Sequence, residues 1–309
     1  MSNSAPILEL RNVTKRIGGK TIVDHLSFDI PQGVVFGLLG PNGAGKTTTI
    51  RMITGLISMT EGSVKIGGLD VNSRFEDAMK LMGGIVENPE MYKYLTGYQN
   101  LIHFSRMHEG ISKDRLKEVI DLVGLGNRIH DKVKRYSLGM RQRLGVAQAL
   151  MHRPKLLILD EPTNGLDPAG IRELRDYLRR LAREEGITVL VSSHLLSEME
   201  LMCDRVAVIQ TGKLVGIQEM GDITRADGAG HVRFDISRPV EGAEIIGRLY
   251  PEAKVLADTS GFEAILEREE IPVIIEQLVK EGFRVYGVKA SGRSLEDKFL
   301  EMTGSGQIE

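Results

Sequence analysis

The sequence predicts an α/β fold built on a mostly parallel sheet, followed by a small α+β domain. Three runs, at residues 34–39, 156–159 and 188–191, are apolar apart from Thr188, as expected for parallel strands that are covered on both faces. Helical patterns alternate with these strands, which is the arrangement of βα units. After residue 219 the pattern of strands and helices restarts, which indicates a second domain.

Length and composition limit the possible functions. The chain has 309 residues, 41% of them apolar, which is enough for two domains with buried cores. The formal net charge of -2 argues against a nucleic-acid partner, because such proteins usually carry a basic face. The single cysteine, Cys203, excludes an intrachain disulfide framework and suits a reducing cytoplasm.

Neither a secretory signal nor a membrane-spanning helix is predicted. The first six residues have no basic start and no apolar segment. The longest apolar run, residues 34–39, is far shorter than the roughly 18 residues that a spanning helix needs. We therefore expect any role in transport to require a separate membrane-spanning partner.

Residues 1–220 are expected to form the α/β domain, with an antiparallel β edge at its N-terminus and a mostly helical insert at about 75–151. The Gly18-Gly19 turn would separate its first two strands. Strands are predicted at 7–13, 27–30, 34–39, 156–159 and 188–191, with a hairpin of 206–210 and 213–217. Helices are predicted at 46–54, 114–123, 138–151 and 168–185, the last three beginning after the caps Ser112, Ser137 and Asp167.

A polar, Gly-containing linker is predicted at residues 221–230, followed by an accessory domain at 231–309. Its elements follow the order strand, helix, strand, strand, helix, strand, which is the ferredoxin-like βαββαβ order. Strands are expected near 232–236, 255–257, 262–266 and 284–288, and helices at 240–249 and 272–281. A capping box at Ser294 would open a final helix.

Residues 40–47 carry the strongest functional motif. They read Gly-Pro-Asn-Gly-Ala-Gly-Lys-Thr and match the P-loop pattern G-x-x-x-x-G-K-[ST] between a buried strand and a helix, which argues against a chance glycine turn. Backbone N–H groups of such a loop surround phosphate oxygens, its lysine reaches the β- and γ-phosphates, and its threonine binds Mg²⁺. The predicted nucleotide-binding residues here are Gly40, Asn42, Gly43, Ala44, Gly45, Lys46, Thr47 and Thr48.

Two adjacent carboxylates end the apolar strand at residues 156–159. We expect Asp160 to hold Mg²⁺ and Glu161 to act as the general base that activates water. Alone, such a pair is as typical of a helix N-terminus as of a site, but its place downstream of a P-loop favours the site.

A third element begins at Ser137, where serine and glycine stand at the predicted start of a helix. Ser137, Gly139 and Met140 could bind phosphate through the hydroxyl, the backbone N–H groups and the helix dipole. Taken alone, the pattern is better explained as an ordinary N-cap.

Together, these motifs resemble the ATPase subunits of ABC transporters. The resemblance covers residues 7–217 and rests on the P-loop, Ser137-Leu138-Gly139-Met140-Arg141, Asp160-Glu161, Gly165-Leu166-Asp167 and His194. The sequences of these motifs are most similar to those of the bacitracin and lantibiotic resistance exporters and related bacterial drug exporters. The family implies a P-loop NTPase domain of the ABC type that hydrolyses ATP with Mg²⁺, with two subunits enclosing two ATP molecules. It also implies that Asp167 joins the two sites and that His194 contacts the γ-phosphate.

The resemblance further implies partners and a location. The chain would form a homodimer, or a dimer with a related ATPase subunit, and would drive a separate integral membrane permease, with no nucleic-acid partner. It would be cytoplasmic, held at the inner face of the membrane through the permease, and would serve export of a drug- or peptide-like compound. The alternatives are a soluble ABC ATPase without a transport role and a regulatory nucleotide-binding module.

Three positions depart from the usual pattern of the family. Leu138 and Met140 stand where glycine and glutamine are usual. Glu87 stands where most members have a glutamine near Mg²⁺, so we expect it, with Thr47 and Asp160, at the metal. Ile17 stands where an aromatic ring usually stacks on adenine, so it offers apolar contact without a π-face.

Overall fold

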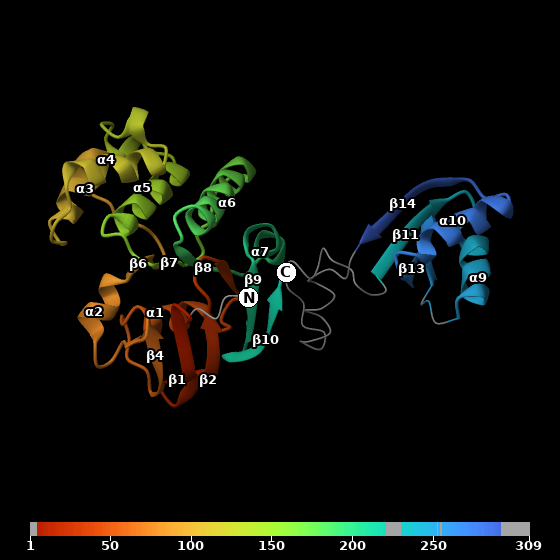
Figure 1. Ribbon diagram of the computed structural model, residues 1–309, viewed down its shortest axis with the longest axis horizontal. Coiled ribbons are helices and arrows are strands. Elements are labelled where there is room, and N and C mark those ends of the chain that lie inside the picture. Colours follow the sequence, from red (N-terminus) through yellow and green to blue (C-terminus); the bar gives the residue numbers. More distant parts are fainter. Residues whose placement is uncertain (1–4, 221–229, 252, 254, 292–309) are drawn as a thin grey trace. The chain divides into compact units, whose positions relative to one another are not determined.

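The computed structural model describes residues 5–220, 230–251, 253 and 255–291 (Figure 1). Within them the chain forms two compact units, one extending to Gln218 and the other beginning at Glu219. Each unit has its own hydrophobic core. The units are therefore described separately.

A six-stranded sheet forms the centre of the first unit, with strand order β10-β9-β3-β8-β7-β6. The pairings β9–β3, β3–β8, β8–β7 and β7–β6 are all parallel, which confirms the predicted parallel sheet. The strands are β3 (Val35–Leu39), β6 (Met82–Ile85), β7 (Leu156–Leu159), β8 (Thr188–Ser193), β9 (Arg205–Gln210) and β10 (Lys213–Glu219). Every residue of β3, β7 and β8 is buried, as the apolar residues of these strands predicted, and in β8 the buried residues include Thr188, Ser192 and Ser193.

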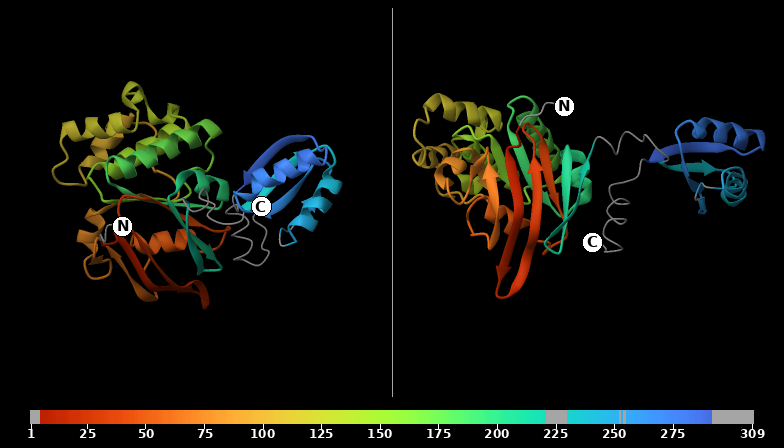
Figure 2. Two further views of the ribbon diagram at one scale, coloured as in Figure 1. Left: turned by 45° about the vertical axis from the view of Figure 1, so that its right-hand side comes forward. Right: turned by 60° about the horizontal axis from the view of Figure 1, so that its bottom comes forward.

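The predicted antiparallel edge is a separate sheet of order β2-β1-β4-β5. Its strands are β1 (Leu8–Ile17), β2 (Lys20–Ile30), β4 (Glu61–Ile66) and β5 (Leu69–Asp70). β1 and β2 form one long hairpin around Gly18 and Gly19, and Figure 2 shows them side by side. They are longer than predicted because residues 14–17 and 20–23, in which polar and apolar side chains are mixed, continue the pairing. β4 and β5 were not predicted, because β4 has only two apolar residues, Val64 and Ile66, and β5 is only two residues long.

Helix α1 (Lys46–Ile53) contributes to the core that joins the two sheets. Its residues Ile50, Met52 and Ile53 are buried in one cluster with side chains from both sheets. Because α1 begins with Lys46 and Thr47, the last two residues of the P-loop motif, this packing holds the loop at a fixed place relative to both sheets.

The helical insert contains α2 (Phe75–Lys80), α3 (Gly97–Ser105), α4 (Lys113–Leu122) and α5 (Leu138–Leu150), with short 3₁₀ turns at Gly126–Arg128 and Val133–Arg135. Ser112 and Ser137 cap α4 and α5, as predicted. The insert is less helical than predicted, because Met82–Ile85 forms strand β6. Two of the four residues of β6 are glycines, so its sequence does not show the apolar pattern of a strand. Gly83 is required because α5 passes so closely that a Cβ atom would lie 2.0 Å from the Ala149 carbonyl oxygen.

Two more helices lie beside the parallel sheet: α6 (Pro168–Arg183) and the unpredicted α7 (Leu196–Met202). α6 begins after its N-cap Asp167 with Pro168 in the first turn, as predicted. It ends two residues before the predicted 185. Leu174, Leu178 and Leu181 form its buried face.

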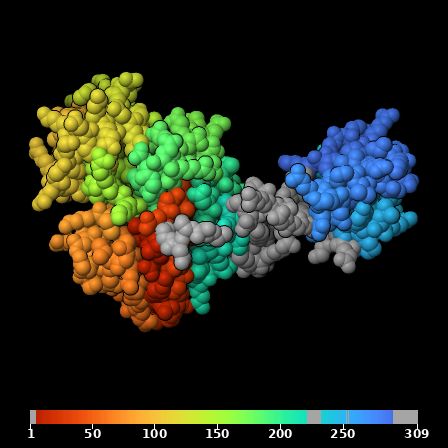
Figure 3. Space-filling model, viewed as in Figure 1, coloured from red at the N-terminus to blue at the C-terminus, as the bar shows by residue number. Residues whose placement is uncertain are grey.

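The second unit is a four-stranded antiparallel sheet with two helices. Its elements are β11 (Gly230–Ile236), α9 (Pro239–Leu249), β12 (Leu256–Ala257), β13 (Gly261–Leu266), α10 (Glu270–Lys280) and β14 (Val285–Ser291), which confirms the βαββαβ order. The strand order is β12-β13-β11-β14, and Phe234 and Phe262 stack at a ring distance of 4.9 Å in the core. Figure 3 shows the surface of each unit. Most of the predicted linker, 221–229, and the predicted final helix at Ser294 lie outside the described residues.

The boundary between the two domains can be tested by truncation. A chain ending after Met220 keeps both sheets and the core of the first unit, so we expect it to stay soluble and to unfold in one cooperative thermal transition. Circular dichroism during heating measures this. Aggregation, or loss of the transition, would place the boundary elsewhere.

Candidate active site

The predicted catalytic groups meet at one edge of the parallel sheet. Leu39 lies opposite Ser193 in the β3–β8 pair, and Leu159 lies opposite Val191 in the β7–β8 pair. The carboxyl ends of these strands therefore lie together, at the edge where open α/β sheets bind ligands. The P-loop follows β3, Asp160 and Glu161 follow β7, and His194 follows β8.

The P-loop has the backbone that phosphate binding requires. Gly43 and Gly45 have φ angles of 80° and 103°, in a region that favours glycine. A Cβ atom on Gly40 would lie 2.2 Å from the Ile209 carbonyl oxygen, so only glycine fits there. Ala44 is buried, Asn42 is exposed, and Thr48 is partly buried in the first turn of α1.

Lys46 lies at the centre of the site and is 5% exposed. Its Nζ donates hydrogen bonds to the carbonyl oxygens of Gly40, at 2.7 Å, and Pro41, at 3.3 Å. The same Nζ lies 3.3 Å from Oε1 of Glu161. The structure thus brings the predicted phosphate-binding lysine and the predicted base into one ion pair.

Two predicted Mg²⁺ ligands are neighbours. Thr47 Oγ1 lies 3.4 Å from Asp160 Oδ1, and Asp160 is 3% exposed. Ser192 Oγ donates to the same Asp160 oxygen at 2.6 Å. A hydroxyl and a carboxylate oxygen at this spacing fit a cation that prefers oxygen ligands, with the other ligands coming from phosphate and water.

Glu161 and His194 form the second pair of the site. His194 Nδ1 lies 2.9 Å from Glu161 Oε2. Glu161 has a φ angle of 48°, which is uncommon for a residue with a side chain. Its backbone N–H donates to Ser192 Oγ at 2.8 Å, which helps to hold this conformation.

Glu87 lies in a different set of contacts from the other predicted Mg²⁺ ligands. It forms an ion pair with Arg51 of α1, its side chain is 60% exposed, and its φ angle is 67°. Within the described part of the chain, His, Cys, Asp and Glu side chains form no group of three or more that could hold a metal. A role for Glu87 at the metal stays a prediction.

The predicted residues at the start of α5 and α6 act as helix caps within the chain. Ser137 Oγ accepts from Met140 N at 3.2 Å, and Asp167 Oδ1 accepts from Gly170 N at 2.8 Å. The two helix starts also pack together. Leu138 lies so close to Gly165 that a Cβ atom there would be 2.8 Å from its Cδ2. Leu166 lies over Gly139 at an ordinary van der Waals distance, with its Cδ2 3.5 Å from the position of a Cβ atom there.

Ile17 ends β1 and is 55% exposed. Val23, which is fully buried, lies in β2 beside the P-loop: a Cβ atom on Gly45 would be 3.3 Å from its Cγ2. Val23 therefore packs under the loop, Ile17 is the exposed apolar side chain, and contact of Ile17 with a base stays a prediction.

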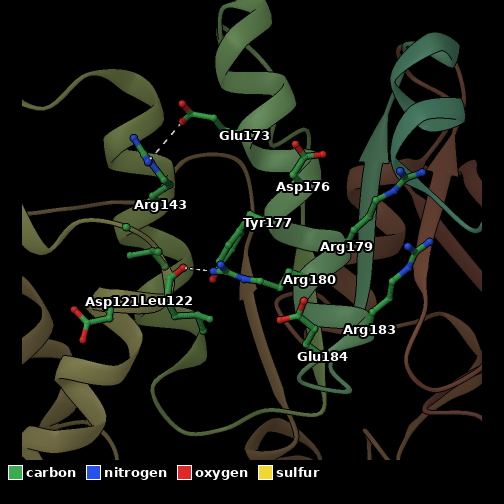
Figure 4. A pocket seen from close by; sticks show the side chains of 12 residues that line it. Asp121, Leu122, Arg143, Glu173, Asp176, Tyr177, Arg179, Arg180, Arg183 and Glu184 are labelled. Carbon is green, nitrogen blue, oxygen red and sulfur yellow. Dashed lines mark hydrogen bonds and ion pairs between the residues drawn. The ribbon is translucent and has the colours of Figure 1, made fainter.

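A cleft of about 750 Å³ lies away from these groups, between α4, α5 and α6 (Figure 4). Charged side chains of both signs line it, and burial raises the pKa of Tyr177 there. Arg143 lies 3.6 Å from Glu173 across the cleft, and Arg180 donates to the Leu122 carbonyl oxygen at 2.7 Å. These contacts connect the helical insert to α6.

The sequence analysis did not identify Ser192 as part of the site. Ser192 and Ser193 precede His194 directly, but serine is common at strand ends, and the hydrogen bonds that Ser192 makes depend on residues 31 and 32 positions away.

Comparison with known proteins shows which family the chain resembles. The family described as "ABC transporter" matches residues 23–164. The uncharacterized ABC transporter ATP-binding protein YhcH of Bacillus subtilis is 57% identical over 298 residues, with 96% of each chain covered. Because this match covers nearly the whole of both chains, the similarity in sequence includes the C-terminal unit.

Two further relatives have names that include a transported compound. The bacitracin transport ATP-binding protein BcrA of Bacillus licheniformis is 38% identical over 98% of this chain and 99% of its own. The lantibiotic transport ATP-binding protein SrtF of Streptococcus pyogenes is 44% identical over 68% of this chain and 89% of its own.

A solved structure described as an ATP binding subunit of an ABC transporter has the same fold. It superposes with a TM-score of 0.63 at 28% identity and covers 71% of this chain and 92% of its own. Within the part of this chain that the structure describes, none of the helices is both long and apolar enough to cross a bilayer.

Ser192→Ala tests how the site is held together. The change removes the acceptor of the Glu161 N–H and a donor to Asp160 at a fully buried position. We expect the free energy of unfolding to fall by about 1–3 kcal/mol, the usual cost of buried polar groups left unpaired, and ATP hydrolysis to slow. Urea denaturation measures the first effect. Ser197→Ala, at an exposed position on α7, is the matched control, and equal stability of the two variants would contradict the prediction.

Proposed function

This chain belongs to the ABC transporter ATP-binding proteins, and we propose that it works as a dimer that couples ATP hydrolysis to a separate export permease. The protein is an ATPase whose substrate is ATP and whose metal is Mg²⁺. The observation that supports the proposal most is the position of Glu161, between Lys46 on one side and His194 on the other.

Glu161 is the proposed general base. In the structure its carboxylate is the counter-charge of Lys46. The γ-phosphate of ATP carries more negative charge than a carboxylate, so it would replace Glu161 as the partner of Lys46. The released carboxylate can then accept a proton from the attacking water.

His194 is the proposed contact to the γ-phosphate. Its Nδ1 lies 2.9 Å from Glu161, and this contact sets the direction of the ring. Because a carboxylate only accepts, Nδ1–H donates to Glu161, and the opposite ring nitrogen, Nε2, can donate to a phosphate oxygen when both ring nitrogens carry a proton. That contact would let His194 respond to the presence of the γ-phosphate.

Thr47 and Asp160 are the residues proposed to hold Mg²⁺, with Glu87 as a further candidate that would first have to leave Arg51. When bound, Mg²⁺ neutralises charge on the phosphates.

The dimer is proposed to complete each site with the start of α5 from the other subunit. Ser137, Gly139 and Met140 would offer a hydroxyl, backbone N–H groups and a helix dipole to the phosphates. Asp167, at the start of α6, would lie at the interface between the two sites. Both a homodimer and a dimer with a related ATPase subunit fit this arrangement.

The permease is proposed to dock on residues 88–100 of the insert. Tyr92 and Tyr94 are 40% and 67% exposed there, and Tyr92 lies 5.0 Å from the His103 ring. The buried Asn100 fixes this segment by hydrogen bonds to the backbone N–H and carbonyl of Tyr92. An aromatic surface on a rigid backbone suits a protein partner.

Export of a peptide- or drug-like compound is proposed from the relatives named for bacitracin and lantibiotic transport. The chain would then act at the cytoplasmic face of the membrane. A soluble ABC ATPase and a regulatory module are the alternatives, and ATPase activity that rises when the permease is added separates the proposal from both.

Glu161→Gln tests the proposed base. The amide keeps the shape of the side chain but cannot take a proton, so ATP should bind and the dimer should stay closed. Size-exclusion chromatography with ATP and Mg²⁺ is expected to show a stable dimer with hydrolysis abolished.

Lys46→Ala is the matched control. It removes a charge-assisted contact to phosphate that is worth about 1.5–3 kcal/mol, so this variant should stay monomeric with ATP and should not turn over. Native hydrolysis rates in either variant would refute the assignment of these residues.

Ile17→Tyr tests how the base is recognised. Stacking of a base on an aromatic ring is worth roughly 1–3 kcal/mol in single-stranded nucleic acid binding. If half of that is realised, the variant should bind ATP about two- to tenfold more tightly as a monomer, and GTP by a similar factor, because every base has a π-face. Titration of fluorescent ATP and GTP measures both affinities. Unchanged or weaker ATP binding would mean that Ile17, with a neighbour such as Val23, already completes the pocket.

A further inference from the structure

One buried carboxylate next to the site has no part in the chemistry proposed above. Glu198 lies in the first turn of α7 and is 8% exposed. A buried carboxylate is costly unless hydrogen-bond donors surround it, so its partners show what it does. Its Oε2 accepts hydrogen bonds from Thr163 Oγ1 at 2.6 Å and from Ser193 Oγ at 2.9 Å.

The two donors belong to the two loops that carry the proposed base and the proposed phosphate sensor. Thr163 follows Glu161 by two residues in the loop after β7, and Ser193 immediately precedes His194 at the end of β8. Both donors are nearly completely buried, at 4% and 1% exposed. A single carboxylate oxygen therefore connects these loops at a point next to their functional side chains.

The same network also fixes the backbone on both sides of His194. Ser193 Oγ accepts a hydrogen bond from Leu195 N at 3.0 Å, while the Ser193 carbonyl accepts from Gly40 N at 3.4 Å. Ser193 thus contacts Glu198, the residue after His194, and the first glycine of the P-loop. A displacement of Ser193 would move His194 relative to both Glu161 and the P-loop.

We infer that Glu198 is a positioning residue that sets the spacing of Glu161 and His194, by holding Thr163 and Ser193 on one oxygen. The inference rests on the proposed roles of Glu161 and His194 in hydrolysis. Glu198 does not touch the reacting atoms. Its effect should therefore appear in the rate of hydrolysis, where a misplacement of about 1 Å can cost about 10²-fold, and little in ATP binding.

The test compares kcat, the KM for ATP and the melting temperature of the full-length chain and its variants. Glu198→Ala is expected to lower kcat at least about tenfold with a KM within about threefold of wild type. Glu198→Gln keeps an oxygen that can accept both hydroxyl groups and should recover part of the loss. A lower melting temperature with unchanged kcat would mean that Glu198 only supports the fold, and would overturn the inference.

Substitutions of Thr163 provide a second test, which remains informative even if the Glu198→Ala variant does not fold. Thr163→Val keeps the shape and removes the donor, whereas Thr163→Ser keeps the donor and removes a methyl group. We expect the valine variant to lower kcat and the serine variant to retain most of it. Equal kcat values in the two variants would overturn the inference.

Lys46→Ala and Glu161→Gln, measured in parallel, keep this inference separate from the proposed function. If they still hydrolyse ATP at the native rate, the proposed function fails. If they behave as proposed and Glu198→Ala keeps the wild-type kcat, only the positioning role fails.

Discussion

The parallel pairing of β3, β8 and β7 is the constraint on which the rest of the ATPase unit depends. Parallel strands place their carboxyl ends at one edge, so three segments far apart in the sequence deliver the P-loop, Asp160-Glu161 and His194 to one place. The register is specific, because a slip by one residue would turn each following side chain to the opposite face. Packing of α1 against both sheets then fixes the P-loop relative to these strands.

Features set by local physics could be predicted from the sequence. β3 and β7 are continuously apolar, the P-loop needs its glycines, and Ser112, Ser137 and Asp167 cap helices by contacts within three residues. The βαββαβ order of the second unit was predicted in the same way, since each of its elements has its own periodic pattern.

Features set by contacts between distant segments could not be predicted. β6 has the sequence Met-Gly-Gly-Ile, and its glycine at 83 makes sense only once α5 is seen to pass against it. Glu87 was placed by resemblance alone, whereas its partner in the structure, Arg51, lies 36 residues away in α1. Ser192 and Glu198 are ordinary residues in the sequence, and their importance comes from hydrogen bonds to other loops.

The start of α5 and the start of α6 are both proposed to lie at the dimer interface. Within one subunit they are joined mainly by apolar packing. The Arg143–Glu173 pair is 3.6 Å long with side chains 34% and 64% exposed, and such surface pairs stabilise little. In contrast, Leu138 fits over Gly165, whose φ angle of 75° and missing Cβ make room for it, and Leu166 fits over Gly139. Close-packed contacts of this kind resist small displacements. Because Ser137 and Asp167 directly adjoin these leucines, a shift of the α5 start would carry the α6 start with it. A leucine at position 138, where glycine is usual in the family, therefore gives this chain a physical link between the helix start that is proposed to contact the partner's ATP and the helix start that is proposed to lie between the two sites.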